Sequence, residues 1–181
     1  MALFRKTASE PLAVTMAGVK LGQRLLVVGI RDPKLAAQLA IKAGLTGRAC
    51  VVDDDEARLA KAAAEIEQEG ALVEPLRAPY GMWPYDPESF DVVVIPQLLP
   101  VLDPESRKRC ASEVFRVLRR GGRVLVIDPA ARGGFAALLN RPASDPAYKG
   151  PAATLQDAGF LAVRELAEAD GVIYVEGIKK A

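Results

Sequence analysis

The sequence contains no histidine among its 181 residues. Histidine is the side chain that most often serves as a general base near neutral pH, and it is the commonest metal ligand in proteins. Its absence therefore argues against a zinc site and against a hydrolase that uses a Ser-His-Asp triad. We expect no metal at the functional site.

Cysteine is almost as scarce, with only Cys50 and Cys110. The first falls inside an expected strand and the second inside an expected helix. Both are therefore interpreted as small buried hydrophobic residues of a protein in a reducing compartment. A disulfide or a catalytic thiol is the less favoured alternative.

Net charge and long apolar runs are also lacking. The formal net charge is +1, so nothing draws the protein as a whole to nucleic acid. No apolar run reaches the roughly 18 residues that a transmembrane helix needs. The opening Met-Ala-Leu-Phe-Arg-Lys has no apolar core of the kind found in signal peptides. We expect a cytoplasmic protein without a membrane span or a nucleic-acid partner.

The most informative segment that is present joins a buried strand to a helix. Four apolar residues at 25–28 run into Gly29, and Asp32 and Pro33 then open a helix. Asp is a good N-cap, and Pro suits the first helical position because its missing N–H would be unpaired there anyway. The pattern predicts a strand at 24–28 and a helix at 33–43. Ligands of such strand-turn-helix units bind beyond the carboxyl ends of the strands.

The rest of the chain repeats this alternation and ends in two segments that alternate apolar and polar residues. Five strand-helix alternations followed by a hairpin indicate an α/β fold, a three-layer αβα sandwich, in a single domain of residues 1–181. Residues 1–18 form an N-terminal extension with a short helix at 11–17. Further strands are expected at 48–52, 71–76, 90–95, 123–127, 160–166 and 171–178, and further helices end near residues 69, 119 and 157, with a helical turn at 135–139.

Several of these segments together resemble the class I S-adenosylmethionine-dependent methyltransferases, in particular their small-molecule, type 11-like branch. The resemblance extends over about residues 19–179, and the helix-Gly-Gly-strand segment around Gly121 and Gly122 is its most specific part. It implies a Rossmann-like, mostly parallel seven-stranded sheet with an antiparallel C-terminal hairpin. The implied strand order is three-two-one-four-five-seven-six, and the implied cofactor is S-adenosylmethionine. The matching segments are residues 25–29, 51–53, 87–94, 113–125 and 155–160.

The resemblance also places the cofactor across the ends of the first, second and fourth strands. Asp53 matches the acid that accepts hydrogen bonds from both ribose hydroxyls, a role that suits the two acceptor oxygens of a carboxylate. The alternative is that Asp53 only caps the following helix. Tyr80 or Trp83 could stack on the adenine, or their loop could simply be packed. The full set of implied cofactor-binding residues is Gly29, Ile30, Arg31, Asp53, Asp54, Pro79, Tyr80 and Pro96.

The glycine-rich turn departs from the family pattern. Three alternating glycines are expected, but only Gly29 is present, and Arg31 and Pro33 occupy the other two places. The middle glycine normally lets the backbone approach the cofactor closely. With this degenerate motif the chain either binds the cofactor through modified contacts or has lost it. In the first case Arg31 pairs with the methionine carboxylate, and Asp32 accepts from its ammonium group.

Methyl transfer from a sulfonium ion needs little acid–base machinery, so the missing histidine does not exclude it. No catalytic residue is assigned. If a base is needed, Tyr80, Tyr85 and Asp128 are the candidates. The function expected is an S-adenosylmethionine-dependent methyltransferase that acts on a small-molecule acceptor.

The main alternative function is a catalytically inactive protein of the same fold that serves as a binding or partner subunit. Another nucleotide-using enzyme is a third, and Asp32 argues against an NAD enzyme. Its carboxylate occupies the helix N-terminus where a pyrophosphate would bind. The acceptor pocket is either open or completed by a second subunit in a homodimer.

Overall fold

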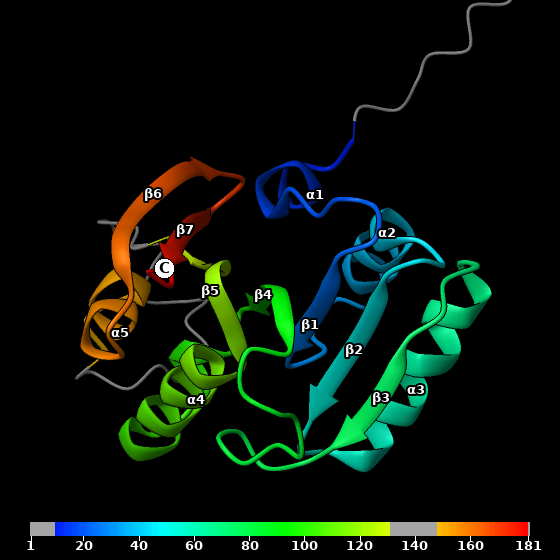
Figure 1. Ribbon diagram of the computed structural model, residues 1–181, viewed down its shortest axis with the longest axis horizontal. Coiled ribbons are helices and arrows are strands. Elements are labelled where there is room, and N and C mark those ends of the chain that lie inside the picture. The colour runs from blue at the N-terminus through cyan, green and yellow to red at the C-terminus, as the bar shows by residue number, and fades with distance from the viewer. Residues whose placement is uncertain (1–9, 131–147, 181) are drawn as a thin grey trace, which may run out of the picture.

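The computed structural model describes residues 10–130 and 148–180, so the helical turn expected at 135–139 and the first nine residues lie outside the described part. Seven strands form one sheet (Figure 1). The strands are β1 Arg24–Val28, β2 Arg48–Asp53, β3 Glu74–Arg77, β4 Phe90–Pro96, β5 Leu118–Pro129, β6 Leu161–Ala169 and β7 Val172–Ile178, and the helices are α1 Leu12–Ala17, α2 Pro33–Ala43, α3 Glu56–Gln68, the 3₁₀ turn η1 Leu99–Val101, α4 Pro104–Val117 and α5 Pro151–Asp157.

The strand order is β3-β2-β1-β4-β5-β7-β6, which confirms the predicted order. The five strands from β3 to β5 are parallel, and β7 runs antiparallel to both β5 and β6. Val27, next to the last residue of β1, lies opposite Val51 of β2 and Val94 of β4. The carboxyl ends of β1, β2 and β4 therefore meet at one edge of the sheet, where such folds bind their ligands.

Helices cover both faces of the sheet (Figure 1). Successive residues of a strand point to opposite faces. Leu25 and Val27 accordingly pack in the core that includes buried residues of α1, α2 and α3. Leu26 and Val28 pack in the second core, with residues of α4 and α5. The predicted three-layer arrangement is confirmed. Within residues 10–130 and 148–180, no helix has the length and apolarity needed to cross a membrane.

The helix after β1 begins as the sequence predicts. The carboxylate of Asp32 accepts a hydrogen bond from the N–H of Leu35 at 3.0 Å, and Pro33 takes the first helical position. Helix α3 begins differently, because its N-cap is Asp55, which accepts from the N–H of Arg58 at 2.9 Å. Asp53 is thereby released from the capping role that was its alternative assignment.

The boundary between α4 and β5 differs from the expectation. The sequence predicts a helix to residue 119 and a strand from 123, whereas α4 ends at Val117 and β5 begins at Leu118. Leu118 is fully buried and pairs with Phe90 of β4. An irregularity between Phe90 and Val92 absorbs the extra length of β5. Burial of Leu118 therefore overrides the turn that Gly121 and Gly122 suggest.

Two smaller boundaries also change. Strand β3 begins at Glu74 rather than at residue 71, and the terminal hairpin turns through two residues rather than four. Asp170 and Gly171 have φ angles of 51° and 78°. Two consecutive residues of positive φ match the twist of the flanking strands, so a longer loop is unnecessary.

Helix α1 is held against the sheet by one arginine of β5. Arg123 donates to the backbone carbonyls of Met16 and Ala17, the latter at 2.5 Å. Its guanidinium also lies 3.4 Å from the buried carboxylate of Glu176 on β7. The side chain of Arg123 thus joins helix α1 to the two neighbouring strands β5 and β7.

Candidate functional site

The tips of β1 and β2 are joined at the edge where the predicted site residues lie. The N–H of Gly29 donates to the carbonyl of Val52 at 2.8 Å, and the N–H of Ile30 donates to the carboxylate of Asp53 at 2.9 Å. Gly29 has a φ of 78°, which disfavours any other residue. A Cβ there would lie 3.2 Å from the side chain of Leu98. The turn therefore requires glycine at its first position.

Asp53 is buried at the end of β2, with 1% of its surface exposed. One oxygen accepts from the N–H of Ile30, and the other accepts from the N–H of Asp55 and from Nε of Arg58, both at 3.0 Å. Burial acts to raise the pKa of the carboxyl group. The two backbone donors and Arg58 outweigh it and hold that pKa below its usual value. Asp53 is thus a charged acceptor inside the protein.

Arg58 is a site residue that the sequence interpretation missed. It lies in the first turn of α3, and besides Asp53 it pairs with Asp54 at 3.4 Å and with Asp55 at 3.7 Å. Its side chain is 36% exposed. The signal in the sequence is its position five residues after Asp53, which lets the first helical turn face back to the strand tip.

The other predicted residues divide into buried and exposed ones. Tyr80 is buried, and the pKa of its phenol is raised by burial and next by the charge of Asp53. Two residues before it, the N–H of Ala78 donates to the carbonyl of Asp53 at 3.1 Å, so the segment that carries Tyr80 leaves β3 beside the acid. Pro96 is buried at the end of β4, opposite Ile127. The structure therefore brings Gly29, Ile30, Asp53 and Tyr80 together, whereas Arg31, Asp54 and Pro79 lie on the surface beside them.

Two aromatic residues of the loop after β3 do not lie at this edge. Trp83 is buried in the core under α4, and its Nε1 donates to the carbonyl of Pro79 at 3.1 Å. Tyr85 packs edge-on against Phe90, with its ring centroid 4.9 Å away, and lies beside Arg48 at the start of β2. Trp83 is therefore a core residue, and Tyr85 lies toward the opposite end of β2 from Asp53.

Asp128, the third candidate base, is fully buried near the end of β5. The hydroxyl of Tyr148 donates to one of its oxygens, and Arg107 of α4 stacks on the Tyr148 ring at 4.4 Å. Burial raises the pKa of Asp128 to about 7. A carboxyl group that titrates near neutral pH at this edge of a sheet has the acidity of a general base.

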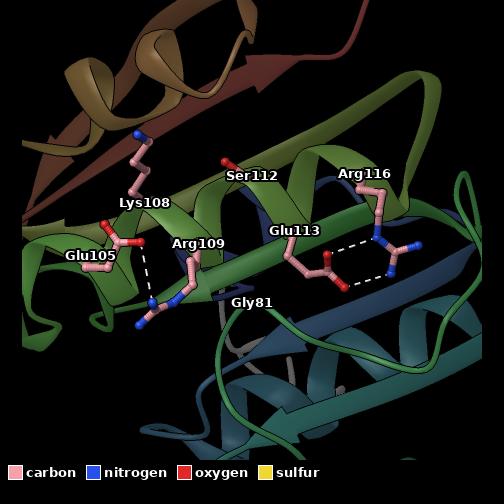
Figure 2. Close-up of a pocket in the computed structure, with 7 residues that line it drawn as sticks. All are labelled: Gly81, Glu105, Lys108, Arg109, Ser112, Glu113 and Arg116. Carbon is pink, nitrogen blue, oxygen red and sulfur yellow. Dashed lines mark hydrogen bonds and ion pairs between the residues drawn. The ribbon is translucent and has the colours of Figure 1, made fainter.

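A shallow pocket lies on α4, where the helix meets the loop after β3 (Figure 2). Glu105 pairs there with Arg109, and Glu113 pairs with Arg116. The second pair also binds the loop. Glu113 accepts from the N–H of Trp83 at 3.0 Å, and Arg116 donates to the carbonyl of Trp83 at 3.2 Å. These charges fix the segment that carries Tyr80.

The family model described as "Methyltransferase domain" matches residues 26–122, which is more than half of the chain. The chain belongs to this methyltransferase family. S-adenosylmethionine is the cofactor that the sequence resemblance implies for a chain of this family.

Two curated relatives are longer than this chain. An uncharacterised protein of Haemophilus influenzae is 40% identical over 79 residues, which are 42% of this chain and 32% of that protein. The ubiquinone/menaquinone biosynthesis C-methyltransferase UbiE of Idiomarina loihiensis is 28% identical over 118 residues, which are 64% of this chain and 46% of that one. This chain thus spans less than half the length of the curated relatives it matches.

The fold also matches solved structures. A SAM-dependent methyltransferase from Aquifex aeolicus superposes with a TM-score of 0.72 at 19% identity, and the match covers 91% of this chain and 86% of that one. The expected fold class is therefore confirmed.

The residues at the strand tips have the chemical groups that the nucleoside part of this cofactor requires. Asp53 is a charged acceptor, Gly29 leaves the turn without a side chain, and Arg31 points to solvent rather than filling the edge. The acceptor oxygens of Asp53 are, however, largely taken by protein donors in this conformation.

Proposed function

We propose that this protein transfers the methyl group of S-adenosylmethionine to a small-molecule acceptor. The observation that carries the proposal is the buried, charged Asp53 at the tip of β2, joined by the N–H of Ile30 to the glycine turn of β1. An acid at this point has the two acceptor oxygens that ribose hydroxyls require. The similarity to a C-methyltransferase of ubiquinone/menaquinone biosynthesis supports a small-molecule acceptor.

In this proposal the chain binds and orients rather than performs acid–base chemistry. Asp53 holds the ribose, Tyr80 and Pro79 border the adenine, and Pro96 borders the methionine part. Arg31 and Asp54, both exposed, reach the cofactor from the rim. The cofactor supplies a methyl group on a positively charged sulfur, which leaves as a neutral thioether. Most of the rate then comes from holding the acceptor atom in line with that methyl group.

If the acceptor has to lose a proton, Asp128 is the candidate base of this edge. It is fully buried, so the proton would reach it through the hydroxyl of Tyr148, which donates to it. The pKa of about 7 leaves Asp128 partly ionised at neutral pH. It lies near the end of β5, and β5 pairs along its length with β4, whose end carries Pro96. An oxygen or acidic carbon nucleophile would need such a base, whereas a neutral amine would not.

Calorimetric titration with S-adenosylmethionine tests the proposal. We expect binding in the micromolar range, weakened about tenfold or more in Asp53→Asn, because an amide has one acceptor oxygen and no charge. The matched control is Glu56→Gln, which makes the same change at an exposed carboxylate that pairs with Arg77 at 3.4 Å. No heat at millimolar cofactor in the folded wild-type protein would remove the proposal.

A non-catalytic protein of the same fold is the second candidate. It is favoured by Arg31 and Pro33 at two of the glycine positions and by the engagement of Asp53 with three donors of its own chain. Such a protein would show no methyl transfer to any acceptor and no binding in the titration above. The two candidates are therefore separated by one measurement.

A further inference from the structure

We infer that Arg58 competes with the ribose of the cofactor for Asp53 and must swing away before a nucleoside binds. The inference rests on the proposed function, because it concerns how the same site takes its cofactor. Its starting point is that the carboxylate is closed in the structure, with only 1% of Asp53 exposed. A ribose hydroxyl cannot reach an oxygen that is covered in this way.

Counting acceptor positions identifies what has to move. A carboxylate offers about four lone-pair sites. Three are used in the structure, by the N–H groups of Ile30 and Asp55 and by Nε of Arg58. One site is then left for two ribose hydroxyls. Removal of a single donor restores the two sites that the two hydroxyls need.

Arg58 is the donor that can leave. The N–H groups of Ile30 and Asp55 belong to the turn after β1 and to the N-cap of α3, so their positions are fixed by the fold. Arg58 reaches Asp53 by a long, partly exposed side chain. It already lies 3.4 Å from Asp54 and 3.7 Å from Asp55. On leaving Asp53 it therefore keeps two carboxylate partners, which lowers the cost of displacement.

The test is a titration of Arg58→Met, which keeps the apolar stem and removes the guanidinium. We expect S-adenosylhomocysteine and S-adenosylmethionine to bind to Arg58→Met about twofold to fivefold more tightly than they bind to the wild type. This range is the one expected for the loss of a partly exposed ion pair. The affinity of Arg58→Lys should lie between that of the wild type and that of Arg58→Met, because a lysine has no forked donor. The matched control, Arg77→Met, removes a neighbouring arginine that pairs with Glu56 instead of Asp53 and should leave the affinity unchanged.

A ligand analogue separates competition from a general change in the fold. The 2′-deoxy analogue of S-adenosylhomocysteine should gain less from Arg58→Met than the parent compound gains, because it needs one acceptor site fewer. Thermal melting without ligand shows whether each variant is folded. Equal gains for both compounds would overturn the inference.

The remaining outcomes distinguish the inference from the function on which it rests. Wild-type binding with unchanged or weaker binding by a folded Arg58→Met overturns the inference and leaves the proposed function intact. Binding by Arg58→Met alone would support competition at Asp53 but would remove the proposed function, because the wild-type protein would not bind the cofactor. No binding by either protein at millimolar ligand removes the proposed function and the inference together.

Discussion

Gly29 shows how one residue determines the shape of the candidate site. Its φ of 78° lets β1 turn toward α2, and its missing side chain makes room for Leu98 from the segment after β4. Gly70, which follows α3, has nearly the same φ of 81°, but a Cβ there would meet nothing within 4 Å. The two glycines therefore differ in packing and share the same backbone constraint.

This difference predicts unequal costs for two identical substitutions. Gly70→Ala should lower the free energy of unfolding by about 1 kcal/mol, because alanine resists a positive φ. Gly29→Ala should lower it by about 2–3 kcal/mol, because the new methyl group also presses on Leu98. Urea denaturation measures both. Equal losses would show that Leu98 yields freely and that only backbone strain matters.

At the residue scale, the sequence predicts that Asp53 lies at the tip of a strand. It does not predict which side chain of the following helix faces back to Asp53. Asp53 follows an apolar run, so its place at a strand tip is evident from the sequence alone. Arg58 reaches Asp53 only because α3 begins at Glu56 and its first turn faces back to the strand. The sequence places four acids at 53–56 and does not show which one caps the helix. The spacing of five residues between Asp53 and Arg58 therefore becomes a usable signal only once Asp55 is known to cap α3.

At the scale of elements, the loop after β3 is held by α4. Glu113 and Arg116 pair with each other at 2.7 Å (Figure 2). Glu113 also accepts from the N–H of Trp83, and Arg116 donates to the carbonyl of Trp83. Trp83 is the only tryptophan of the chain and is 5% exposed. Its fluorescence consequently reports whether the loop is attached to the helix.

We expect Glu113→Ala to release this loop. The substitution leaves the N–H of Trp83 without its acceptor, a loss of about 1–3 kcal/mol for a buried donor. Tryptophan emission should shift to the red and become more accessible to iodide. Glu105→Ala is the control, because Glu105 lies on the same helix and pairs with Arg109 at the surface instead of with Trp83. An unchanged spectrum in a folded Glu113→Ala would show that core packing alone holds Trp83.

Local signals account for the elements that the sequence predicts well. Strand β1 and helix α2 have the predicted bounds, because an apolar run, an Asp N-cap and a Pro at the first helical position are all local. The predicted end of α4, at residue 119, was wrong by two residues, because the helix ends at Val117. The helix gives way to β5 because Leu118 pairs with Phe90, which lies 28 positions earlier, in β4. A contact of that range leaves no mark in the local pattern.

At the scale of the whole molecule, charged groups make stability depend on pH in two opposite directions. Hydrogen-bond donors hold the pKa values of Glu113, Asp53 and Asp91 below their usual range, against the effect of burial. These carboxylates stabilise the fold above their unfolded pKa of about 4, and that contribution is lost as the pH falls. Asp128 acts in the opposite sense.

The folded pKa of Asp128 is raised to about 7 by burial. Its contribution to stability is therefore complete below its unfolded pKa of about 4 and is lost as the pH rises through 7. Asp128→Asn fixes the side chain in its neutral form and keeps an acceptor for the hydroxyl of Tyr148. The advantage of the variant over the wild type should therefore be larger at pH 8 than at pH 5, by on the order of 2–3 kcal/mol.

Urea denaturation at pH 5 and pH 8 measures this difference, with Asp157→Asn as the control. Asp157 is an exposed residue at the end of α5, so its variant should follow the pH dependence of the wild type. If the free energy of unfolding of Asp128→Asn fell between pH 5 and pH 8 as much as that of the wild type, ionisation of Asp128 would cost the fold no stability. Its oxygen that accepts no bond from the described residues would then have to be solvated. A flat profile would instead establish that one buried carboxyl group near the end of β5 sets the alkaline limit of the fold.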